Sequence, residues 1–153
     1  MTNTPNLASV ASAWANCSNL TPFPLLDVSS CLTFSSAWLG CSSLTAFPLL
    51  DTSSSQGFYQ SWQNCSSLAT FPAAMFDSCQ TTDYTNAFNN CALTAQSMEN
   101  IAVSIAAAAA TYNLTNGTLG LDGGTNAGEG SYSEATQEAL DYLDGNGWQV
   151  TVN

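Results

Sequence analysis

The sequence predicts a single α/β domain built from a repeat of 24 residues, and three observations support this prediction. Trp, Cys, Leu, Phe and Pro recur in the same order and at the same spacing, which is typical of stacked repeats. Each copy ends in an apolar run with the length of a short strand, and an alanine-rich segment after the last copy has the periodicity of a helix. A chain of 153 residues is long enough to bury its own core.

The repeat has three clear copies and one degenerate copy. The copies around Trp14, Trp38 and Trp62 are 24 residues apart, and the next copy slips by two residues to Phe88 and Cys91. The unit reads aromatic-x3-Trp-x2-Cys-x2-Leu-x2-Phe-Pro. No single copy can bury both its aromatic residues and its Leu-Phe run, so stability must come from the stacking of neighbouring copies.

A period of 24 lies within the range of leucine-rich repeats, whose core L-x-x-L-x-L forms a short parallel strand. Leu44-x-x-Phe47-x-Leu49 fits this core. The spacing of Phe34 and Trp38 predicts a helical turn on the side opposite the strand. We therefore expect an α/β fold of the leucine-rich-repeat solenoid type, right-handed, with short parallel strands, short helical turns on the opposite side and a helix-containing C-terminal cap.

The segment after the repeats has its own helix and strand signals. Thr94 is a suitable N-cap for a helix over residues 95–112, and Ser133 is a suitable N-cap for a second helix. Glycines flank one short strand within residues 117–124, and the chain ends in a strand over residues 148–152.

We expect these segments to form one domain over residues 1–153. Residues 1–8 lead into the repeats of residues 9–93, and residues 94–153 close the C-terminal end, because an open stack of repeats needs a cap. A separate small domain over the last segment is the alternative, although a segment of that length forms only a marginal core alone.

The charge of the chain excludes several functions. It contains 11 acidic residues and no Lys, Arg or His, which gives a formal net charge of −11. Without basic side chains we expect no binding of nucleic acid or anionic membranes, and catalysis through His or Lys is impossible. The longest apolar stretch, residues 101–110, is about half of the ~20 residues that a membrane-spanning helix needs. We expect no enzyme activity, no cofactor and no membrane insertion.

The six cysteines predict a row of buried thiols. One repeat position holds four of them and a second position holds two, where the intervening copy has Ser55. The first group is Cys17, Cys41, Cys65 and Cys91, and the second is Cys31 and Cys79. A zinc site needs closely spaced pairs such as C-x2-C, and the sequence has none. We expect free thiols that fill an apolar slot, while one or two disulfides along the row are the alternative.

Acidic residues also recur along the repeats. Asp27, Asp51 and Asp77 each have Ser or Thr close behind, a composition that closes turns. A row of carboxylates could instead bind Ca²⁺, and Asp122 begins a glycine-rich loop that resembles half of a calcium loop but lacks its terminal Glu. We expect turn capping and no metal, because carboxylates one repeat apart do not gather the several ligands that calcium needs.

The tryptophan row has two interpretations. Surface aromatic rings are common in carbohydrate sites, but the spacing of Trp38 with Phe34 directs the rings into the core. We therefore expect the binding face on the strand side of the repeats, formed by small neutral residues. These are Thr21, Pro22, Pro24, Thr45, Ala46, Pro48, Ala69, Thr70 and Pro72. Such a face suits a glycan or a flat protein surface, bound by hydroxyl hydrogen bonds and apolar contact.

The unit A-W-x-x-C-S-x-L-T-x-F-P-L-L-D-x-S-S, at residues 13–30 and 37–54, resembles the cysteine-containing leucine-rich repeats of the BspA-like family. The resemblance covers residues 9–93, with Trp where many members have Phe. Such repeats occur in bacterial surface proteins, and Trp-bearing versions similar to these occur in tail-fibre-like proteins of bacteriophages. The resemblance implies an adhesion or recognition module, and the family has no catalytic residue to transfer.

We therefore expect a non-enzymatic recognition or adhesion module that binds a surface glycan or protein through the strand face. We expect it outside the cell or on a virion, although residues 1–7 show no pattern of a classical signal peptide. The alternative is a structural protein that self-assembles into a fibre or coat by stacking its N-terminal edge, residues 7–15, on another subunit. Self-association that depends on protein concentration would favour the alternative.

Overall fold

The computed structural model describes residues 7–153, so the first six residues of the expected N-terminal lead lie outside the described part of the chain. Its regular elements all lie in the C-terminal half. They are β1 (Asp83–Tyr84), α1 (Ala95–Tyr112), β2 (Thr118–Gly120), the short 3-10 helix η1 (Glu129–Ser131), α2 (Glu134–Gly145) and β3 (Gln149–Thr151). The three strands form one parallel sheet in the order β1-β2-β3, with Leu119 of β2 between Tyr84 and Val150.

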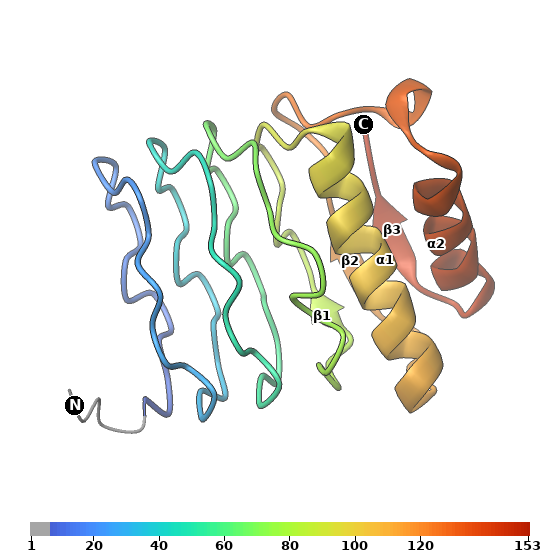
Figure 1. Cartoon of the computed structure of the whole chain (residues 1–153), viewed down its shortest axis with the longest axis horizontal. Coiled ribbons are helices and arrows are strands. Elements are labelled where there is room, and N and C mark those ends of the chain that lie inside the picture. Colours follow the sequence, from blue (N-terminus) through green and yellow to red (C-terminus); the bar gives the residue numbers. More distant parts are fainter. Residues whose placement is uncertain (1–6) are drawn as a thin grey trace.

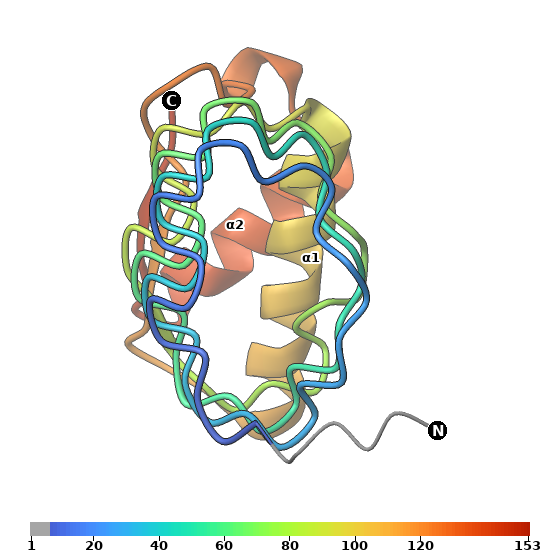
Figure 2. The same ribbon diagram turned by 90° about the vertical axis from the view of Figure 1, so that its left-hand side faces the viewer.

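The repeats form a series of coils that lie side by side without regular secondary structure. Figure 1 shows the coils in sequence order from the N-terminal end towards α1. Figure 2 shows that they follow nearly the same oval path, with both helices at the C-terminal end. Residues 7–82 contain no helix and no strand, and their only β-bridges are two isolated parallel ones, Ser9 with Thr33 and Ala46 with Thr70.

The predicted leucine-rich-repeat solenoid is therefore wrong. That fold required a parallel strand over the Leu-Phe run of each repeat and a helical turn at each aromatic pair. The three short strands of the structure lie instead at residues 83–151, and its two α-helices follow the repeats. We expected Phe34 and Trp38 on one helical turn. Trp38 instead lies in a run of hydrogen-bonded turns over residues 35–40, and Phe34 directly precedes this run.

Tight turns replace the expected helical turn for a local reason. The N–H of Cys17 donates to the carbonyl of Trp14 at 3.0 Å, three residues back, which closes a β-turn. Asn16, the third residue of this turn, has a φ of 62°, and Gly40 in the next coil has a φ of 72°. Asn and Gly adopt this left-handed conformation at the least cost, and it interrupts a right-handed helix. The Asn or Gly before each repeat cysteine therefore favours tight turns over a helical turn.

Three columns of aromatic rings run through the coils. In the tryptophan column, the rings of Trp38 and Trp62 are 5.2 Å apart at an interplanar angle of 8°. The columns consist of Trp14, Trp38, Trp62 and Phe88; of Phe23, Phe47 and Phe71; and of Phe34, Phe58 and Tyr84. Trp38 and Trp62 are fully buried, so the expected inward orientation of the tryptophans is confirmed there. These columns form the centre of one core that extends from Val10 to Trp148.

The expected elements after the repeats are confirmed. α1 begins after Thr94, whose hydroxyl accepts a hydrogen bond from the N–H of Ser97, and α2 begins after Ser133, which caps Thr136 in the same way. α1 also binds the third repeat, because the Ser97 hydroxyl donates to the carbonyl of Ala69 at 2.8 Å. Residues 94–153 thus share a core and hydrogen bonds with the repeats.

Truncation of Trp38 tests the aromatic column. Trp38 stacks on a ring at both sides, whereas the half-buried Trp14 stacks on only one side of its column. We expect Trp38→Ala to lower the free energy of unfolding by about 3–5 kcal/mol, as for other buried aromatic residues, and Trp14→Ala to lower it by clearly less. Chemical denaturation of both variants measures this difference. Equal losses would contradict the central position of Trp38.

Substitutions at Gly40 test the left-handed turn. Asn occupies the same position at residues 16, 64 and 90, and the carboxamides of Asn64 and Asn90 accommodate each other in a 3.0 Å hydrogen bond. We expect Gly40→Asn to be close to the parent in thermal stability, and Gly40→Val to lose at least about 1–2 kcal/mol because a β-branched residue resists positive φ. In a helical turn Asn and Val would cost similar amounts, so similar melting temperatures would contradict the turn.

Candidate functional site

The nine expected face residues are accessible. Thr21, Pro22, Pro24, Thr45, Ala46 and Thr70 are exposed, and Pro48, Ala69 and Pro72 are half-buried. The second and third copies lie in direct contact here, because the N–H groups of Ala69 and Thr70 both donate to the carbonyl of Thr45, at 3.0 and 3.2 Å. The first copy is held beside the second by the stacked rings of Phe23 and Phe47, 5.5 Å apart. That this face binds a ligand remains a prediction.

Sequence reasoning missed two leucines on this face. Leu49 was assigned to the strand core of its repeat, which gives the same position to Leu25 in the first copy, but 54% and 76% of these side chains are exposed. Leu50, one residue later, is buried instead. Because no strand forms here, the inward-outward alternation of a strand does not apply to the residues after Pro48. An exposed leucine repeated at the same position of two coils adds an apolar row beside the threonines.

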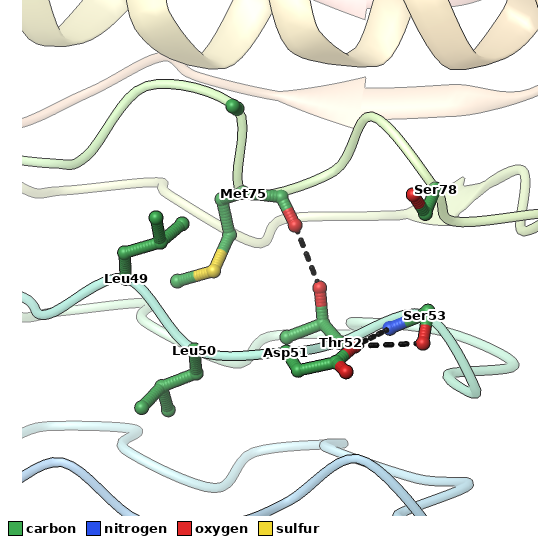
Figure 3. A pocket seen from close by; sticks show the side chains of 8 residues that line it. Leu49, Leu50, Asp51, Thr52, Ser53, Met75 and Ser78 are labelled. Carbon is green, nitrogen blue, oxygen red and sulfur yellow. Dashed lines mark hydrogen bonds between the residues drawn. The ribbon is translucent and has the colours of Figure 1, made fainter.

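A shallow pocket opens next to this row, with a volume of about 280 Å³. Figure 3 shows Leu49, Leu50 and Met75 on one side of it, and Asp51, Thr52 and Ser53 on the other. The Thr52 hydroxyl donates to the carbonyl of Met75 at 2.7 Å, which joins the second and third copies beneath the pocket. The pocket thus combines an apolar wall with one exposed carboxylate, that of Asp51.

The sequence predicted turn capping by all three repeat aspartates, and the structure confirms it for Asp27 and Asp51. Asp27 accepts hydrogen bonds from the hydroxyl of Ser29 at 2.7 Å and from its N–H at 3.2 Å, and these two bonds lower the pKa of its carboxyl. Asp51 accepts the same pair of bonds from Ser53, at 2.7 and 3.1 Å.

The other candidate calcium ligands are engaged differently. Asp77 accepts a hydrogen bond from the hydroxyl of Ser104 in α1 at 2.6 Å, and Asp122 accepts one from the hydroxyl of Thr151 at 2.8 Å. Each carboxylate is thus held by a separate segment. Within residues 7–153, no group of three or more Cys, Asp or Glu side chains is arranged to hold a metal ion.

The repeat cysteines are free thiols that follow the tryptophan column. The thiol of Cys65 donates to the carbonyl of Trp38 at 3.1 Å, and Cys91 donates to the carbonyl of Trp62 at 3.1 Å. Burial raises the pKa of the Cys65 thiol, and it raises the pKa of Cys91 to about 12. Cys17, at the N-terminal end of the column, is exposed. The expectation of unpaired, buried thiols is confirmed for the column except at Cys17, which is not buried.

The second cysteine position is also buried and unpaired. Cys31 and Cys79 each donate their N–H to a carbonyl three residues back, at Val28 and Phe76, and Ser55 does the same to Thr52. Burial raises the pKa of the Cys79 thiol to about 11, in spite of a contact with the Thr52 hydroxyl at 3.2 Å.

Comparisons with known proteins identify no relative. No protein-family model matches the chain, and neither the curated proteins nor the solved structures contain a match. The resemblance to BspA-like repeats therefore depends on the sequence motif alone. Among the helices of residues 7–153, none has the length and apolar character that crossing a membrane requires.

Thiol labelling tests the cysteine column. In the folded protein at neutral pH we expect a thiol-alkylating reagent to modify Cys17 quickly and the buried thiols only after unfolding, because a buried thiol is both inaccessible and protonated. Mass spectrometry of chymotryptic peptides identifies the modified residues, since the chain has no Lys or Arg for trypsin. Rapid native labelling of Cys65 would contradict the burial of the column.

Alkaline pH tests the same thiols through stability. The pKa values of Cys79 and Cys91 are raised by burial to about 11 and about 12, whereas a thiol in an unfolded chain titrates near about 8.5. Their contribution is therefore fully present below about pH 8.5 and is lost as pH rises. We expect the free energy of unfolding to fall between about pH 9 and 10, approaching about 1.4 kcal/mol per pH unit for each thiol.

Urea denaturation across this pH range measures the slope, and Cys91→Ala should reduce it. A free energy of unfolding that is constant up to about pH 10 would contradict the buried, protonated state of these thiols.

Proposed function

We propose that the protein is a non-enzymatic recognition or adhesion module that binds a surface glycan or protein through the exposed face of its repeats. One observation carries the proposal: threonines, prolines and the leucines Leu25 and Leu49 form an exposed neutral surface repeated from coil to coil. We call this surface, with the nine residues named above, the Thr-Pro-Leu face.

The chemistry of this face supports a ligand with both hydroxyl and apolar parts. Thr21, Thr45 and Thr70 offer hydroxyl groups that donate and accept hydrogen bonds, and the prolines and leucines offer apolar contact. Sugars present both kinds of surface. Because residues 28–50 contain no charged side chain and Asp27 and Asp51 are the nearest charges in sequence, ion pairs contribute little to such binding.

The location of the protein is part of the proposal. An adhesion module acts outside the cell or on the surface of a virion, and the BspA-like motif at residues 13–30 and 37–54 favours such a location. A composition without Lys, Arg and His also favours a partner that is not a nucleic acid.

A glycan array probed with the purified protein tests the proposal. For the glycan that binds, we expect Thr45→Arg to abolish binding, because a long charged side chain would cover the centre of the Thr-Pro-Leu face. The control Glu138→Gln changes an exposed residue of α2 and should bind like the parent. We also expect the affinity to be nearly unchanged between low and high NaCl.

Two results would contradict this function. Binding that is lost in Glu138→Gln but retained in Thr45→Arg would place the site on the acidic C-terminal segment. A steep fall of affinity with salt would show that recognition depends on the carboxylates rather than on the neutral face.

A further inference from the structure

The N-terminal edge of the stack differs chemically from the Thr-Pro-Leu face. Within each coil, the segment that leads to the repeat cysteine donates alternate backbone N–H groups to the following coil. Ser12, Trp14 and Asn16 donate to Ser35, Ala37 and Leu39; Ser36, Trp38 and Gly40 donate to Tyr59, Ser61 and Gln63; and Gln60, Trp62 and Asn64 donate to Thr85, Ala87 and Asn89. In every bond of this ladder, the coil nearer the N-terminus supplies the N–H and the next coil supplies the carbonyl.

Because of this direction, the first coil has backbone carbonyls that receive no ladder hydrogen bond. Ala11, Ala13 and Ala15 occupy the positions whose carbonyls accept ladder bonds in the later coils, and no backbone N–H of residues 7–153 donates to their carbonyls. We call these three carbonyls the acceptor edge.

The side chains beside the acceptor edge are those that a preceding coil would cover. Trp14 is half-buried and Cys17 is exposed, although their equivalents Trp38 and Cys41 are buried. The Cys41 thiol donates to the carbonyl of Trp14 at 3.2 Å, and Cys17 has no coil in front of it within residues 7–153 to provide such a carbonyl. Acceptors, ring and thiol are therefore exposed at one place.

We propose that the acceptor edge is a docking surface for a polypeptide segment that folds as a further coil of this repeat. Such a segment offers three N–H donors to the carbonyls of Ala11, Ala13 and Ala15, an aromatic ring to stack on Trp14, and a carbonyl to accept the thiol of Cys17. This chemistry follows from the ladder, because each later coil receives those same three contacts from the coil before it.

A second copy of the chain does not match this chemistry at either end. Two acceptor edges placed face to face would bring carbonyls against carbonyls, which repel each other and leave acceptors without donors. At the other end, β3 consists of Gln149, Val150 and Thr151, and Trp148, the aromatic residue directly before this strand, is only 3% exposed and cannot stack on Trp14.

The test inserts an additional coil into the full chain. A duplicate of residues 33–56, with its copy of Cys41 changed to Ser, is placed between Ala8 and Ser9, where it continues the repeat spacing. We expect the rate of Cys17 alkylation to fall to that of the buried Cys65, and the melting temperature to rise. In the control insert, the copies of Ser36, Trp38 and Gly40 are all proline. This insert has the same length but cannot form a coil, because proline removes the three N–H donors and the stacking ring and cannot adopt the positive φ of Ser36 and Gly40, so Cys17 should stay as reactive as in the parent.

Three results would overturn the inference. Fast alkylation of Cys17 in a folded chain with the native insert would show that the edge does not accept a coil. Equal protection by both inserts would show that the edge does not recognise a folded coil. Concentration-dependent self-association of the parent that protects Cys17 would show that the occupant is a second copy.

Discussion

The structure depends on a single constraint: each coil must advance by the spacing at which both the backbone ladder and the aromatic columns are satisfied. The N–H of Trp38 reaches the carbonyl of Ser61 at 2.9 Å, and the same residue places its ring 5.2 Å from that of Trp62. These two spacings are compatible because hydrogen-bonded neighbours lie about 4.8 Å apart, which is within the range of centroid separations of offset-stacked rings, about 4.5–7 Å. The thiols fit the same spacing, because each thiol donates to the carbonyl of the tryptophan in the preceding coil, as Cys41 does to Trp14 and Cys65 to Trp38.

This constraint explains why the chain tolerates unfavourable backbone conformations. Ser12, Ser36 and Gln60 each have a φ of 55°, which costs roughly 1–2 kcal/mol for a residue with a side chain. The cost recurs at the same position of every coil, where the next N–H turns back to a carbonyl of its own coil, as that of Ala37 does to Phe34 at 3.0 Å. Buried rings and satisfied ladder groups offset it, so the interior coils are stable only with neighbours on both sides.

The sequence predicted part of this arrangement and misjudged another part for a definite reason. Periodicity located the buried Trp38 and Trp62, the unpaired thiols and the caps at Thr94 and Ser133. The i,i+4 spacing of aromatic residues suggested a helix. Two consecutive tight turns also bring residues with this spacing to one side of the chain, so the spacing alone does not distinguish the two structures. The deciding signal was the Asn or Gly before each cysteine, a residue type that favours positive φ. The outward position of Leu25 and Leu49 had no such signal, since it follows from the absence of a strand.

The most direct test of this account is NMR detection of scalar couplings across hydrogen bonds in the repeats. The account predicts a coupling between the N–H of Trp38 and the carbonyl carbon of Ser61, and another between the N–H of Trp14 and that of Ala37. A coupling from the N–H of Trp38 to the carbonyl of Phe34, four residues back, would instead demonstrate a helical turn at this position and contradict the ladder on which the structure depends.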